Sequence, residues 1–149
     1  MQISTKFTIA VHLLTAVAYF SESQKVTSDF LAGSIGSNPV IIRNIMGKLK
    51  EAGLIDIKRG PGGVTLEKKL TDISFLDIYK AVETNSEEVL FRFHENPNPL
   101  CPIGRTIHKS LDGALEEIQK NFEVELSKWT LADVYENSLE ELRKEKQNE

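Results

Sequence analysis

The sequence predicts a mainly α-helical protein with one small β-hairpin, arranged as a winged helix-turn-helix domain followed by a long dimerisation helix. The first 70 residues show the order helix, helix, tight turn, helix, hairpin. "GPGG" at residues 60–63 separates two short alternating segments, as a hairpin tip would. Between residues 107 and 129 apolar residues recur with a period near 3.5, which is typical of a helix that meets a partner helix.

Composition is that of an ordinary globular protein. The chain has 149 residues, of which 40% are hydrophobic and 27% charged. No apolar run approaches the roughly 18 residues needed to cross a bilayer, and the N-terminus lacks the basic-then-apolar pattern of a secretion signal. We therefore expect a cytoplasmic protein without a membrane partner. A single cysteine excludes an internal disulfide and a multi-cysteine metal site within one chain.

Charge is divided unevenly along the chain. The net charge is −4, but residues 1–70 hold nine Lys/Arg against five Asp/Glu, a net charge of +4. Residues 71–149 hold nine Lys/Arg against 17 Asp/Glu, a net charge of −8. This asymmetry predicts that the N-terminal half faces a polyanion, from which the acidic half is repelled.

Two helices are predicted in the first 36 residues. Ser4 can cap a helix that runs to about Phe20, because apolar residues recur at helical spacing behind it. Thr27 or Ser28 starts a second, shorter helix, which Gly36 ends. Only about three residues then separate the second helix from the third, as a helix-turn-helix requires.

The third helix opens at "SNP". Asn38 is a strong N-cap candidate, and Pro39 fits the first helical position, where its missing N–H costs nothing. The helix stops at Gly53, and its apolar residues at helical spacing are Val40, Ile41, Ile45 and Leu49. "LIDIKR" and "VTLEK" then alternate in polarity and predict a hairpin with residues 60–63 at its tip.

The remainder is predicted to be helical around one long loop. Ser74 can cap "FLDIYKAVE", and "HENPNPLCP" is kept from helix by its prolines and asparagines. The long helix begins at about Pro102; "TLADV" then makes one more turn, and a charged tail is helical at first and frayed at its end. We expect two units: a winged helix-turn-helix domain over residues 1–83, and the loop, long helix and charged segment over residues 84–149.

The third helix occupies the position of a DNA-recognition helix, whose N-terminal residues meet base edges in the major groove. Arg43 can bond bidentately to guanine, and Val40 can contact a thymine methyl. At the amino end, hydroxyls, a cation and the free N–H groups of a helix start suit phosphate. The candidate DNA contacts outside the hairpin are Ser4, Thr5, Lys6, Ser37, Asn38, Pro39, Val40 and Arg43.

"KRGPGG" favours a hairpin pressed against DNA over the phosphate loop of a nucleotide enzyme. A phosphate loop needs its glycines between a strand and a helix, whereas these lie between two strands. In the hairpin, Lys58 and Arg59 supply charge, and Gly60, Gly62 and Gly63 let the backbone approach a narrow groove. A merely solvated hairpin is the alternative. No Ser/His/Asp set, carboxylate pair or nucleotide fingerprint indicates an enzyme.

In these residues the sequence resembles the Rrf2 family of bacterial winged-helix transcriptional regulators. The resemblance covers nearly the whole chain and rests on "MQISTKFTIAVHLL", "IGSNPVIIRNIMGKLKEAGLIDIKRGPGGVTL", "LTDISFLDIYKAVE", and "CP" before a long helix closing in "TLADV". It implies a homodimer that binds a partly palindromic double-stranded DNA operator and usually represses transcription. The dimer interface is expected at Ile107, Leu111, Ala114, Ile118, Phe122, Leu126 and Trp129.

Cys101 marks a departure from part of this family. Cluster-binding members carry three cysteines before the long helix, and one thiolate per chain cannot hold a standard iron–sulfur cluster. His94 and His108 each lie seven residues from Cys101, a spacing that matches no metal site, so we expect no metal and no cofactor.

Two interpretations of Cys101 stay open. At a helix start, N–H dipoles would favour its thiolate, and oxidation would end at sulfenic acid, a mixed disulfide or a bridge to the other subunit. This predicts a redox sensor. The alternative is a small buried hydrophobic residue.

Two other functions stay open as well. The chain can be a repressor that responds to a small molecule bound near the dimer helix, with an inert Cys101. It can also be a winged-helix module that binds another protein instead of DNA.

Overall fold

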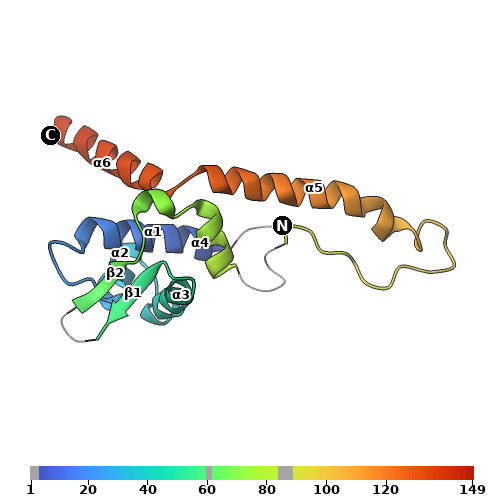
Figure 1. Ribbon diagram of the computed structural model, residues 1–149, viewed down its shortest axis with the longest axis horizontal. Helices are drawn as coiled ribbons and strands as arrows, with labels where there is room; N and C mark the ends of the chain where they lie inside the picture. The colour runs from blue at the N-terminus through green and yellow to red at the C-terminus, as the bar shows by residue number, and fades with distance from the viewer. Residues whose placement is uncertain (1–3, 60–61, 84–88) are drawn as a thin grey trace.

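The computed structural model describes residues 4–59, 62–83 and 89–149. Its elements are α1 (Thr5–Phe20), α2 (Ser28–Ile35), α3 (Pro39–Glu51), β1 (Ile55–Lys58), β2 (Gly63–Leu66), η2 (Leu70–Asp72), α4 (Phe75–Val82), α5 (Ile107–Lys128) and α6 (Leu131–Gln147). The first four helices and the hairpin form a body; α5 returns to it from the far end of a long arm, and α6 continues from there over the body to the C-terminus (Figure 1). The predicted mainly helical fold with one hairpin is confirmed.

The helix caps of the N-terminal half follow the sequence signals. Ser4, Thr27 and Asn38 each accept a hydrogen bond from a backbone amide two or three residues later, at 3.3, 3.1 and 2.8 Å. Gly36 and Gly53, which follow α2 and α3, take φ values of 75° and 77°. This left-handed conformation is the one that glycine adopts without steric cost. The predicted starts and ends of these helices are confirmed.

One hydrophobic core lies inside the body. β1 and β2 pair antiparallel, with Ile55 opposite Leu66 and Lys58 opposite Gly63. The Val64 amide donates to the Val26 carbonyl at 2.9 Å, which ties the hairpin to the segment before α2. The largest fully buried side chains come from α1, α2, α3, β1, α4 and α6 and from the segments between them, and none comes from α5: Leu13, Leu14, Val17, Val26, Leu31, Ile42, Leu49, Leu54, Ile55, Ile73, Ile78 and Leu131.

The inward face of α3 includes only two of the four apolar residues expected at helical spacing. Its buried residues are Ile42, Ile45, Met46 and Leu49. Val40, a candidate DNA contact, and Ile41 are 56% and 46% exposed. Because each residue advances about 100° around a helix, Val40 lies nearly opposite the buried stripe and Ile41 about a quarter turn from it. The start of α3 therefore presents two apolar side chains to solvent.

The starts of α4 and α6 are joined. Ser74 and Thr130 each begin a capping box, with Asp77 and Asp133 as their partners. Ser74 and Thr130 also form an isolated antiparallel bridge. Two backbone hydrogen bonds flank the bridge, from the amide at 75 to the carbonyl at 129 (2.9 Å) and from the amide at 131 to the carbonyl at 73 (2.8 Å). The junction between α5 and α6 is thereby fixed to the body.

α6 is one helix of 17 residues, Leu131–Gln147. The tail is helical at first, as predicted, but the separate turn and the early fraying are wrong, because the helix continues to Gln147. Leu131, its first residue, is fully buried in the core, and the helix packs along α1. Burial at the start and packing along one side stabilise a helix whose sequence looks highly charged. The boundary predicted at residues 83 and 84 stays a prediction, and residue 84 lies outside the described residues.

The long helix begins at Ile107, later than the predicted start near Pro102. Asn98 holds the preceding chain in a closed turn: its side chain accepts from the amide at 100 at 2.9 Å, and its carbonyl accepts from the Cys101 amide at 3.2 Å. The turn returns so closely that a Cβ at Gly104 would lie 2.4 Å from the Asn98 carbonyl oxygen. These local bonds compete with the helix and delay it.

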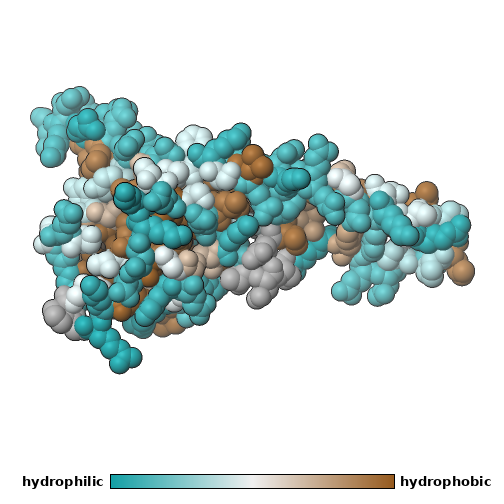
Figure 2. All heavy atoms as spheres, in the orientation of Figure 1, coloured by the Kyte–Doolittle hydropathy of each residue, from teal (hydrophilic) through white to brown (hydrophobic). Residues whose placement is uncertain are grey.

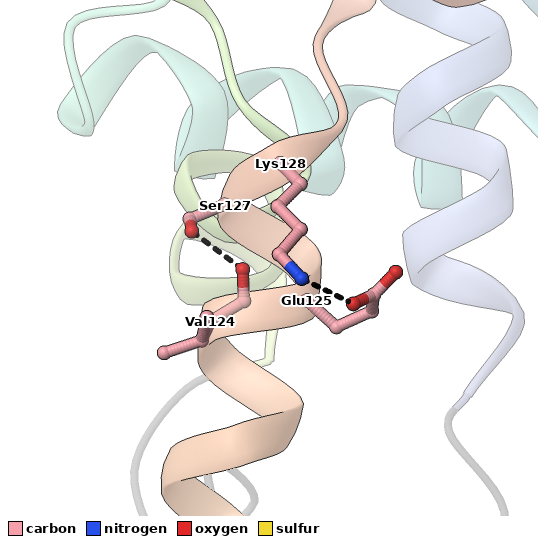
Figure 3. Close-up of polar contacts among 4 residues, drawn as sticks. All are labelled: Val124, Glu125, Ser127 and Lys128. Atoms are coloured by element: carbon pink, nitrogen blue, oxygen red, sulfur yellow. Dashed lines mark hydrogen bonds and ion pairs between the residues drawn. The ribbon is translucent and has the colours of Figure 1, made fainter.

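α5 has 22 residues and no buried side chain, and it spans about 33 Å at 1.5 Å per residue. Close to its end, Lys128 pairs with Glu125 at 3.1 Å, and Ser127 donates to the Val124 carbonyl at 2.6 Å (Figure 3). The hydrogen bond and positive charge from Lys128 lower the pKa of the exposed Glu125 carboxyl. An exposed pair of this kind adds little stability.

Leu131→Ala tests whether α6 belongs to the core of the body. Deleting a fully buried leucine leaves a cavity, and we expect the free energy of unfolding to fall by about 2–5 kcal/mol. Leu142→Ala on the same helix removes a side chain that is 39% exposed, and its cost should stay below about 1 kcal/mol. Urea unfolding followed by circular dichroism measures both. Equal losses in the two variants would contradict the packing of α6.

Candidate nucleic-acid interface

α3 and the hairpin lie on the side of the body away from α5 and α6 (Figure 1). The left-handed Gly36 turns the chain sharply after α2, and Asn38 and Pro39 then open α3. Arg43 lies exposed one turn further along and makes no ion pair with any residue that the structure describes. Ser37 is half-buried in the turn. The predicted recognition residues thus gather at one helix end.

Two further residues of this face were missed by the sequence analysis. Ile41 and Asn44 are both exposed near the start of α3. The signal that could have found them is the buried stripe of α3 at positions 42, 45, 46 and 49. Ile41 and Asn44 both lie outside that stripe. Together with Val40 and Arg43, they give the exposed start of α3 two apolar contacts, one cation and one amide. Apolar groups suit thymine methyls, and Arg and Asn suit guanine and adenine edges.

The wing brings Lys58 and Arg59 together at the exposed end of β1. Gly62 and Gly63 allow close packing that a side chain would prevent. A Cβ at Gly62 would lie 2.6 Å from the Lys58 Cβ, and one at Gly63 would lie 2.7 Å from the Val26 carbonyl oxygen. Gly63 also has a φ of 65° and is buried. Their expected role in approaching a groove stays a prediction, and Gly60 lies outside the described residues.

The start of α1 lies at a different place on the body. The Ser4 hydroxyl donates to the Glu83 carboxylate at 2.5 Å, and Glu83 is only 4% exposed. Lys48, near the end of α3, donates to the Val82 carbonyl at 3.5 Å. The start of α1 therefore meets the C-terminal end of α4, which Lys48 of α3 also reaches, and the Ser4 hydroxyl already has an acceptor inside the protein. Phosphate contacts from Ser4, from the exposed Thr5 and from the half-buried Lys6 stay predictions.

Comparison with known proteins identifies this architecture. A sequence profile of the Rrf2 family, described as an iron-dependent transcriptional regulator, matches residues 3–137. The chain belongs to the Rrf2 family. YwnA of Bacillus subtilis (strain 168), which its name assigns to HTH-type transcriptional regulators, is 38% identical over 132 residues, covering 89% of this chain and 96% of YwnA.

Solved structures place this Rrf2 chain among winged-helix regulators. A crystal structure of a protein named for DNA binding has a TM-score of 0.68 at 32% identity and covers 87% of this chain and 97% of its own. IscR of T. potens shares the fold, with a TM-score of 0.66 at 24% identity over 93% of this chain and 88% of IscR. Family and fold together make the protein a helix-turn-helix, DNA-binding transcriptional regulator. No helix in the described ranges is long and apolar enough to cross a membrane.

The residues around Cys101 do not fit the iron chemistry that the family description implies. Cys101 is the single cysteine, and the His108 ring nitrogen lies 3.1 Å from the His94 carbonyl oxygen. Within the described ranges, no group of three or more His, Cys, Asp or Glu side chains is arranged to hold a metal ion. One thiolate supplies too few ligands for a standard cluster.

Cys101 is exposed in the turn at the far end of the arm, so both of its predicted environments are wrong. It does not start a helix, because α5 begins six residues later at Ile107, and the helix dipole falls off within the first turn. It is not a buried hydrophobic residue either. Its neighbours Leu100 and Ile103 are 85% and 68% exposed, and apolar atoms show at this end of the arm in Figure 2.

The predicted dimer seam divides into two parts. Leu111 and Ile118 are exposed on the arm. Phe122 packs edge-to-face on Tyr79 of the same chain at 5.4 Å, and Trp129 lies 6.5 Å from Phe75 between ring centroids. Trp129 is also the C-cap of α5, outside its last helical turn. The other seam positions on α5 are Ile107, Ala114 and Leu126, and their role in a dimer stays a prediction.

Proposed function

We propose that this Rrf2 protein is a homodimeric repressor that binds a partly palindromic operator in the cytoplasm, with no membrane partner. The observation that carries the proposal is the meeting of the exposed start of α3 with the cations of the wing on one side of the body. A helix in the major groove and a basic loop on the backbone are the two contacts of winged-helix recognition. Two copies would present two such faces to half-sites about one helical turn apart.

Arg43 and Arg59 are expected to do different work on the operator. Arg43→Ala should cost about 1–3 kcal/mol and relax preference at one base pair. Arg59→Ala should weaken all sequences alike and lower the slope of log affinity against log salt by about 1. Fragments selected from random DNA, measured by fluorescence anisotropy at several salt concentrations, give both quantities. Salt-independent retention of the chosen fragments, or no binding at all, would favour the protein-interaction module instead.

α5 supports the dimer in this proposal. A helix of 22 residues that buries none of its side chains in its own chain needs a partner to cover its apolar seam. Ile118, 47% exposed near the middle of the arm, is well placed for that contact.

Ile118→Glu should convert the dimer to a monomer, because it places a charge in an apolar seam. Sedimentation velocity measures the mass, and circular dichroism checks the fold. Glu117→Lys, on the exposed neighbouring position, serves as the control and should leave the dimer intact. A wild-type protein that sediments as a monomer, or an Ile118→Glu variant that stays dimeric, contradicts this interface.

Thiol oxidation at Cys101 is the proposed trigger, supported by the exposure of its sulfur. Peroxide would oxidise the thiolate to sulfenic acid, and a second thiol would displace water to form a disulfide. Oxidant should release wild-type protein from the operator, and Cys101→Ser should abolish this response while binding normally without oxidant. Equal oxidant sensitivity in both proteins would reject the sensor role.

A groove between α1 and α6 favours the small-molecule alternative. It has a volume of about 720 Å³, and mostly apolar side chains line it, among them Val11, Tyr19, Val134 and Leu142. His12 and Ser34 lie at its edge, 3.0 Å apart. This groove lies on the body, whereas the sequence placed such a pocket near the dimer helix. A thermal-shift screen of metabolites distinguishes this function, because a ligand of the folded state raises the melting temperature.

A further inference from the structure

A recess lies between the start of α2, the middle of α3 and the base of the hairpin. It has a volume of about 410 Å³. Lys25 and Ser28 line it on one side, Arg43 and Gly47 on the second, and Lys58 on the third. The three cations come from segments far apart in sequence, and the hairpin's hydrogen bond to Val26 brings them together.

Two glycines place two of these lysines. A Cβ at Gly63 would lie 3.0 Å from Cγ of Lys25, and a Cβ at Gly62 would lie 2.6 Å from Cβ and 3.0 Å from Cδ of Lys58. Each lysine stem therefore crosses the bare backbone of a glycine in the wing. With any larger residue at these positions, the stems would have to move away. The side chains of Lys25 and Lys58 thus lie against the backbone of the wing.

The charge in this recess is uncompensated by the protein. The side chains of Lys25, Arg43 and Lys58 make no hydrogen bond or ion pair with any residue in the described ranges. Surface lysines are often solvated singly and indicate nothing. Three cations from three segments around one hollow, with no carboxylate among its lining residues, instead form an anion site.

We propose that this recess seats one backbone phosphate of the bound DNA, with Lys25 as a contact that closes the gap between the recognition helix and the wing. The inference rests on the proposed function, since it assigns a further residue to the same interface. DNA is favoured as the source of the phosphate, because the exposed start of α3 and the end of β1 flank the recess. When α3 lies in the major groove and the wing lies on the backbone, the DNA strand between them presents a phosphate to the recess.

Lys25→Gln tests the proposal. Neutralising one phosphate contact should lower the slope of log affinity against log salt by about 0.9, with a similar loss on every DNA sequence. Lys25→Arg should keep the wild-type slope. Lys109→Gln, which removes the same charge from an exposed position on α5, serves as the matched control and should also keep it.

The outcomes separate this inference from the proposed function. If wild-type protein binds DNA with a steep salt dependence and Lys25→Gln has the same slope, the recess holds no phosphate and the inference is overturned. It is equally overturned if Lys109→Gln lowers the slope as much, because the effect is then that of net charge. If wild-type protein does not bind DNA at all, the proposed function itself fails.

Discussion

The bridge between Ser74 and Thr130 is the interaction on which the rest of the architecture depends. Each residue caps a helix through its own capping box, and the two caps pair as a minimal sheet. Two separate helix starts are thereby satisfied and joined without a long side chain. Because the amides and carbonyls at these caps lie near the core, their pairing also avoids buried unsatisfied backbone groups. The segment between α5 and α6 is fixed to the body here.

This closure explains why one long helix stands apart from its own body. The chain from residue 89 runs outward beside the arm, and α5 then brings it back to the body. The outward segment lies along α5, where the amide at 90 donates to Gln119 at 2.8 Å and Phe93 packs on His108 at 4.5 Å. α6 then covers α1 on the side away from α3. α5 and α6, both in the acidic half, thus lie on the side of the body away from α3 and the hairpin.

Helix caps and turns could be predicted from the sequence, whereas contacts between segments far apart in the sequence could not. Caps at Ser4, Asn38 and Ser74 depend on neighbours within four residues, so their signals are visible in the chain. The length of α6 depends on Leu131 entering a core whose other members lie between Ala10 and Val82, and no local pattern records this. Asn98 lies in a loop, as predicted, but its hydrogen bonds to the amides at 100 and 101 close a turn, and α5 starts after that turn, at Ile107.

A count of charges in the sequence treats all lysines alike, although the fold gives them different partners. The Lys48 ammonium donates a hydrogen bond to the Val82 carbonyl at the C-terminal end of α4. Lys58, ten residues later, lies across Gly62 and stays available to a ligand. The difference arises from backbone shape, since the wing's glycines leave room for a lysine stem where a Cβ would displace it. A substitution at such a glycine can therefore change the electrostatics of the DNA face without altering a single charge, because it moves the ammonium group away from the phosphate that it would meet.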